Sequence, residues 1–125
     1  MADHLAPEPI PDSALLFRRI HRIFFDSDSG HVSSGAFDGP EMSVNWEKYA
    51  TPEETAEQDK SGNTVAIASL RSGFCRSVEQ TVVHDPLPEQ ENTSANLAHA
   101  LVRGRKSKPI KHKLRDAATL VWRHT

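Results

Sequence analysis

Apolar and polar residues alternate along several short stretches of this chain, and such alternation is typical of strands with one buried face. In residues 14–25, ALLFRRIHRIFF, a strand would place Phe17 and Arg19 on one face. A helix would instead bring Leu16 and Ile20 into an apolar stripe. Aromatic residues and isoleucine are common in strands, so the composition favours the strand over the helix.

Four further runs predict strands, because apolar and β-branched residues recur in them between turn-forming segments. They are MSVNW at 42–46, TVAIASL at 64–70, SVEQTVVHD at 77–85 and LAHALV at 97–102. For the second of these runs, a short helix reaching Arg71 is the alternative. The proline-rich, acidic segment between the last two runs predicts a loop.

One helix is predicted from its capping residues. Thr51 is followed by Pro52 and Glu54, which together make the pattern of a capping box with proline in the first turn. Gly62 can adopt the left-handed conformation that ends a helix. We therefore expect a surface helix near 52–61.

A second helix is predicted from apolar spacing near the C-terminus. Ser107 or Lys108 can cap it, and an apolar stripe recurs at helical intervals after Pro109. The pattern indicates an amphipathic helix near 109–122. The residues of the stripe are Ile110, Leu114, Ala117, Ala118 and Val121.

The length of 125 residues is typical of one domain. Strand and helix signals are mixed along it, so the expected fold is a small soluble α+β domain over 14–125 with a short mixed or antiparallel sheet. Pro7, Pro9 and Pro11 lie close together near the start of the chain. They predict a flexible proline-rich arm over 1–13.

Positive charge is concentrated in one segment. The chain has 15 Lys and Arg against 17 Asp and Glu, a net charge of −2, yet residues 103–115, RGRKSKPIKHKLR, hold seven basic residues and no acidic one. Taking those seven charges from −2 leaves −9 for the rest of the chain. This asymmetry argues against a protein that coats nucleic acid with its whole surface, but it permits a local anion site at the start of the C-terminal helix. The residues expected to bind phosphate or another anion are Arg103, Arg105, Lys106, Lys108 and Lys111. Of these, Arg105 and Lys106 are expected to project into water.

Two histidines are candidates for chemistry, because they lie on predicted strands that could be neighbours. His84 and Asp85 end one run, and His99 lies between two alanines of the next. A histidine in an apolar run needs a hydrogen-bond partner, so we expect His99 to be buried and bonded to His84 or Asp85. These three residues are the catalytic candidates. No histidine pair has the spacing of a known metal motif, so neither a metal nor a cofactor is predicted.

The single cysteine, Cys75, cannot form an internal disulfide, which favours a reducing cytoplasm. No apolar run approaches the roughly 20 residues that a membrane-spanning helix needs, so no membrane association is predicted.

Two functional hypotheses follow from these residues. The first is a small cytoplasmic binding or accessory module whose basic C-terminal turn and helix engage a nucleic acid, a nucleotide or an acidic protein. The alternative is a small enzyme acting on a nucleotide or phosphoester, with His84, Asp85 and His99 as its centre and the basic turn as a phosphate clamp. The enzyme requires the histidines and the basic turn to converge on one pocket, whereas the module requires only an exposed basic face. The sequence leaves open the partner's identity, the oligomeric state and whether the chain is catalytic.

Overall fold

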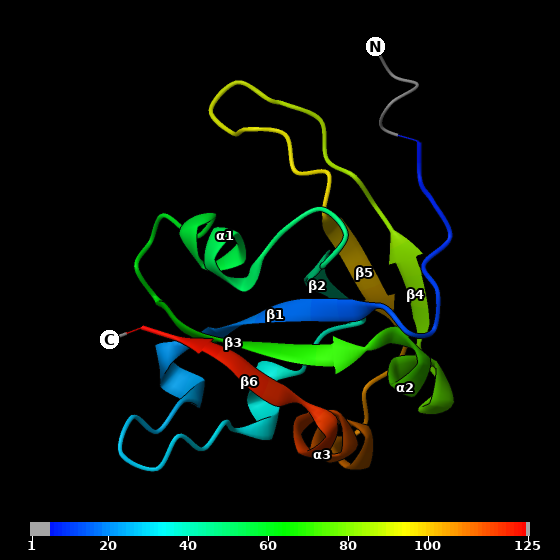
Figure 1. Ribbon diagram of the computed structural model, residues 1–125. Helices are drawn as coiled ribbons and strands as arrows, with labels where there is room; N and C mark the ends of the chain where they lie inside the picture. Colours follow the sequence, from blue (N-terminus) through cyan, green and yellow to red (C-terminus); the bar gives the residue numbers. More distant parts are fainter. Residues whose placement is uncertain (1–5, 125) are drawn as a thin grey trace.

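A single antiparallel sheet runs through the structure (Figure 1). The computed structural model describes residues 6–124, and within them the sheet has six strands in the order β4-β5-β2-β1-β3-β6. The strands are β1 (Leu15–His21), β2 (Glu41–Trp46), β3 (Thr64–Arg71), β4 (Thr81–His84), β5 (His99–Arg103) and β6 (Thr119–Arg123). The α-helices of this part of the chain are α1 (Pro52–Glu57), α2 (Ser72–Ser77) and α3 (Lys108–Ala117). The predicted α+β fold with an antiparallel sheet is therefore confirmed.

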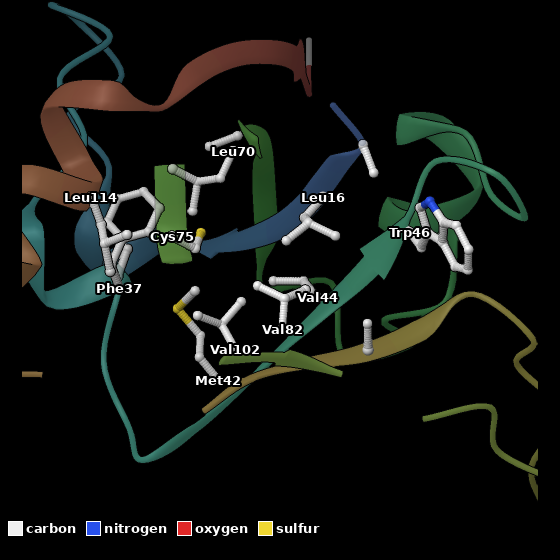
Figure 2. Packing of buried hydrophobic residues seen from close by; sticks show 14 of the residues in the cluster. Leu16, Phe37, Met42, Val44, Trp46, Leu70, Cys75, Val82, Val102 and Leu114 are labelled. Carbon is white, nitrogen blue, oxygen red and sulfur yellow. The ribbon is translucent and has the colours of Figure 1, made fainter. Parts of the chain in front are cut away.

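The main hydrophobic core lies on one face of the sheet, which we call the core face (Figure 2). Side chains alternate between the two faces of a strand, and the alternate apolar residues of the central strands point into this core. Cys75 of α2, Leu114 of α3 and Phe37 from the segment before β2 cover them, and each of these three is fully buried. The strand residues of the core include Leu16, Ile20, Met42, Val44, Leu70, Val82, Ala100 and Val102.

The opposite face of the sheet, which we call the second face, is covered in part by α1. Ala56 of α1 packs there in a small cluster with Phe17 and Ile67. The registers Phe17 with Asn45 and Asn45 with His99 place these three side chains on this same face. The second face is therefore part apolar and part polar.

The predicted capping box at α1 is confirmed. The Thr51 hydroxyl accepts a hydrogen bond from the Glu54 backbone N–H at 3.0 Å, and the Glu54 carboxylate accepts one from the Thr51 N–H at 2.9 Å. The helix ends at Glu57, however, and does not extend to residue 61. Asp59 explains the early end, because its carboxylate accepts from the Ser61 N–H and hydroxyl and so stabilises a turn in place of another helical turn.

The C-terminal helix is confirmed at its start and corrected at its end. Ser107 is the N-cap of α3, as predicted, but the helix ends at Ala117 and the predicted extension to residue 122 is wrong. Residues 119–123 form β6, which pairs with residues 66–69 of β3. The sequence TLVWR is rich in strand-forming residues, and the free edge of β3 supplies their backbone partners.

The other predicted strands are confirmed with shorter bounds. The run at 14–25 forms β1 over 15–21, and the runs at 42–46, 64–70 and 97–102 supply most of β2, β3 and β5. The run at 77–85 forms a strand only over Thr81–His84, because α2 extends to Ser77 and the turn that follows it includes Glu79, whose φ is +70°.

Residues 6–13 are packed against the fold, so the prediction of a flexible arm is wrong for this part of it; residues 1–5 lie outside the described part. Ile10 is 4% exposed and belongs to the main core. Arg76 of α2 donates to the Ile10 carbonyl at 2.7 Å and to the Asp12 carboxylate at 2.6 Å. We call residues 6–13 the N-terminal strap; it runs beside β4 and over α2 (Figure 1).

Candidate functional site

Lys106 was expected to project into water, and this expectation is wrong. Its side chain is buried, at 8% exposure, and its ammonium donates to the carbonyls of Gly39 at 2.7 Å, Val102 at 2.8 Å and Gly104 at 3.3 Å. Burial lowers the pKa of Lys106, since the charged form loses its hydration. This cation stabilises the turn before α3 and has little surface left for an external anion.

Two more cations of the expected anion site are paired within the chain. Arg103 lies 2.9 Å from the Glu41 carboxylate on the neighbouring strand, and Lys111 lies 3.2 Å from the Asp38 carboxylate. The backbone N–H of Gly39 and the Lys111 ammonium hold the pKa of Asp38 below its usual value. Asp38 therefore stays ionised and keeps Lys111 in place.

Arg115 is paired as well, because its guanidinium lies 3.0 Å from the carboxylate of Asp116. The other cations of residues 103–115 face solvent. Arg105 and Lys108 are exposed, and neither has an acidic partner within residues 6–124. Lys113, on α3, is also exposed and unpaired in the same range. We call Arg105, Lys108 and Lys113 the basic set.

His84 lies on the core face, where its ring is packed and both of its nitrogens are hydrogen-bonded. It is 3% exposed, and its ring stacks on Tyr49 with a centroid distance of 5.7 Å. Its Nδ1 accepts from the Glu8 N–H at 3.0 Å, and its Nε2 lies 2.7 Å from the Leu97 carbonyl. Since a carbonyl can only accept, Nε2 carries the proton and both ring nitrogens are satisfied. His84 therefore anchors the N-terminal strap and the β4–β5 loop.

His99 lies on the second face, so the two histidines do not meet. The register pairs His84 with Ala100, which places His84 and His99 on opposite faces of the sheet. The expected bond from His99 to Asp85 is confirmed: His99 Nδ1 lies 3.1 Å from the Asp85 carboxylate and 3.0 Å from its carbonyl. His99 was expected to be buried, but it is only partly buried: its side chain is 13% exposed, and that of Asp85 is 43% exposed.

The other ring nitrogen of His99 has a partner that the sequence interpretation missed. Nε2 lies 3.2 Å from the hydroxyl oxygen of Ser43, on the neighbouring strand β2. Nδ1 must carry the proton of neutral His99, because the Asp85 carbonyl can only accept; Nε2 is then free to accept from the Ser43 hydroxyl. The alternation in MSVNW put Ser43 and Asn45 on one face, and only the pairing of β2 with β5 would have brought His99 beside them.

A network of side-chain amides around the buried Asn45 fixes the neighbourhood of this cluster. Asn45, at 2% exposure, donates to the Thr55 hydroxyl and to the Gln58 side chain, both at 2.9 Å. Asn96 donates to the side-chain amide oxygen of Asn45 at 3.1 Å, and Arg19 donates to the Thr55 backbone carbonyl at 3.3 Å. These bonds tie α1 and the β4–β5 loop to the second face.

Arg18 fixes the backbone of Ser43 from the core side. Pairing between β1 and β2 runs over Leu16 and Phe17 and then ends. The Arg18 guanidinium lies at this point and donates to the carbonyls of Ser43 at 3.0 Å and Ala36 at 2.9 Å. The backbone of Ser43 is therefore held although β1 no longer pairs with it.

Two hollows in the surface do not include the candidate residues. One, of about 300 Å³, is lined by His31, Phe37, Arg115 and Leu120 among others, and one of about 460 Å³ by residues such as Ser69 and Phe74. Within residues 6–124, no three His, Cys, Asp or Glu side chains gather as metal ligands would. No helix in this range is long and apolar enough to cross a bilayer.

Comparisons of the chain with protein-family models, with curated proteins and with solved structures find no match.

Proposed function

We propose that this protein is a small cytoplasmic binding module whose basic C-terminal turn and helix engage a phosphate-rich or acidic partner. The observation that supports it best is the basic set: Arg105, Lys108 and Lys113 project from the turn and helix without an acidic partner in residues 6–124. The rest of the chain is acidic, so an anionic partner would be attracted to this segment and repelled elsewhere. The buried, free Cys75 is consistent with a reducing compartment.

The rigidity of the turn also supports this proposal. Lys106 ties the turn to three backbone carbonyls, and the Gln80 amide donates to the Arg105 carbonyl at 3.0 Å. Gly104 has a φ of +147°, and a Cβ there would lie 2.8 Å from the Gln80 side chain. A turn fixed in this way presents Arg105 and Lys108 with little backbone entropy left to lose on binding.

The alternative, a phosphoester enzyme built from His84, Asp85, His99 and a basic clamp, has less support. His84 and His99 lie on opposite faces of the sheet. The basic helix α3 packs on the core face through Leu114, away from His99. The histidines and the basic set therefore do not converge, as that enzyme would require.

The test is the salt dependence of binding to labelled DNA and RNA. Each phosphate contact on duplex DNA contributes a slope of roughly −0.9 in log K against log salt, so three contacts give a slope of about −2.7. We expect weak binding at about 50 mM salt that is mostly lost at about 200 mM. The double variant Arg105→Ala/Lys108→Ala should flatten the slope by nearly two units, since each removed contact takes away about 0.9.

The matched control is Arg22→Ala/Lys60→Ala, which removes two exposed cations elsewhere and should leave the slope unchanged. If neither nucleic acid binds at the lower salt but an acidic polypeptide does, and Arg105→Ala/Lys108→Ala abolishes that binding, the partner is an acidic protein. Binding of neither kind of polyanion would contradict the proposal.

A further inference from the structure

We infer that Ser43, His99 and Asp85 form a nucleophilic site on the second face, with Ser43 as the nucleophile and an uncharged ester as the substrate class. The hydroxyl of Ser43, the two nitrogens of His99 and the carboxylate of Asp85 follow one another at 3.2 Å and 3.1 Å. A hydroxyl is a weak nucleophile until an adjacent base takes its proton, and a third group commonly orients that base. The inference does not depend on the basic set, which lies elsewhere in the fold.

The proton positions favour this role. The Asp85 carbonyl fixes the proton of neutral His99 on Nδ1, as described above, so the lone pair of Nε2 points at the Ser43 hydroxyl. The Asp85 carboxylate lies against the same Nδ1, where it would stabilise the imidazolium that forms when Nε2 takes a proton. Asp85 is thus a positioning residue, and His99 is the base.

The surroundings are compatible with a nucleophile. Ser43 is only partly buried; it lies within β2, with its carbonyl held by Arg18. Asp85 and His99 are the residues at which the β4–β5 loop leaves and re-enters the sheet. The site therefore lies at the mouth of that loop, where a substrate can approach from solvent.

Charge and apolar surface indicate the substrate class. The Asp85 carboxylate would repel a phosphoester dianion, and the cations of the basic set lie on another part of the fold; an uncharged ester meets no such repulsion. Leu87 and Leu97, in the same loop, are 37% and 39% exposed, and they offer apolar contact for an acyl chain.

The chemistry balances with water as the co-substrate. Ser43 Oγ forms a bond to the ester carbonyl carbon while its proton passes to His99 Nε2. The bond from that carbon to the leaving oxygen then breaks, and the leaving alcohol takes the proton from Nε2. Water attacks the acyl-serine in the same way, with His99 again moving the proton, which releases the carboxylic acid and restores Ser43.

The test is covalent labelling by a fluorophosphonate probe, with the modified residue identified by peptide mass spectrometry. We expect the probe to label Ser43 in the wild-type chain and to label nothing in Ser43→Ala. His99→Asn should slow the labelling at least about 100-fold, the range expected when a general base is lost. Ser94→Ala, which removes an exposed serine of the same loop, and Arg105→Ala/Lys108→Ala should both label like the wild type.

A second measurement covers the case in which His99→Asn fails to fold. In Ser43→Cys, the new thiol should react with iodoacetamide at least about tenfold faster than the same thiol in Ser43→Cys/Asp85→Asn, because a neighbouring His–Asp pair favours the thiolate. Absence of Ser43 labelling in the folded wild-type chain, together with equal alkylation rates in these two variants, would overturn the inference.

Discussion

At the scale of single residues, Lys106 and Lys108 differ in a way that their positions in the chain do not reveal. Both belong to the same basic run, yet Lys106 is buried with three carbonyl partners and Lys108 faces solvent. A buried cation is tolerated when several hydrogen-bond acceptors replace its water. The sequence therefore shows where the basic residues are concentrated. It does not show which of them are buried and bonded within the fold, because that depends on the Gly39 carbonyl, which is distant in the sequence.

Replacing Lys106 by methionine should destabilise the protein strongly. The substitution keeps the length of the side chain but leaves the carbonyls of Gly39 and Val102 without their charged donor. We expect a loss of about 2–4 kcal/mol in the free energy of unfolding, measured by urea melts. Lys108→Met is the matched control and should change stability by less than about 0.5 kcal/mol. Equal, small effects of the two substitutions would show that the Lys106 bonds contribute little.

The two histidines show a second limit of inference from sequence. Their strands, which the sequence allowed to be neighbours, do pair, and His99 bonds to Asp85, one of the two partners expected for it. Whether His84 joins them depends on register, because a shift of one residue moves every side chain to the other face. The long loop between Asp85 and His99 does not fix that register, so Ser43 and not His84 completes the cluster.

At the scale of secondary-structure elements, the two main helix starts provide a matched pair. The Thr51 hydroxyl accepts from the Glu54 N–H at the start of α1, whereas the Ser107 side chain makes no capping hydrogen bond at the start of α3. We expect Thr51→Ala to cost about 1 kcal/mol of stability, because it removes a formed cap. Ser107→Ala should cost well under about 0.5 kcal/mol, since no cap bond is lost. Chemical denaturation of both variants tests this, and a larger effect at Ser107 would contradict it.

The boundary between α3 and β6 shows why local patterns located elements better than their ends. Ala117, Ala118 and Val121 continue the helical spacing of Ile110 and Leu114, so periodicity alone extends the helix. Residues 119–123 form a strand because their backbone pairs with the edge of β3, and that edge exists only once the sheet has formed. The capping box of α1, by contrast, is complete within four residues, so the sequence predicted its start correctly.

At the scale of the whole molecule, the N-terminal strap closes the core over α2. The Asp12 carbonyl accepts from the Gly73 N–H at 2.9 Å, and the Ser72 hydroxyl donates to the Pro11 carbonyl. Proline content suggested a flexible arm, but proline also suits an extended segment that makes few ladder bonds of its own. Ile10 provides the apolar anchor, and burying such a side chain contributes about 1.5–3 kcal/mol.

Cys75 can report on whether the strap protects the core. It lies on α2, beneath the strap, and is fully buried; this burial raises the pKa of its thiol to about 11. Both the lack of access and the scarcity of thiolate should make Cys75 unreactive toward a disulfide reagent in the native protein.

Deleting residues 2–11 removes Ile10 and the Pro11 contact, so α2 should open more often than the rest of the fold. We expect the native-state reaction of Cys75 to become at least about tenfold faster in this deletion, measured under conditions where circular dichroism shows an intact fold. Deleting residues 2–5 is the control, since it removes none of the contacts described for the strap, and it should leave the rate unchanged. An unreactive Cys75 in the longer deletion would mean that α2 is held by the sheet alone and that the strap has no protective role.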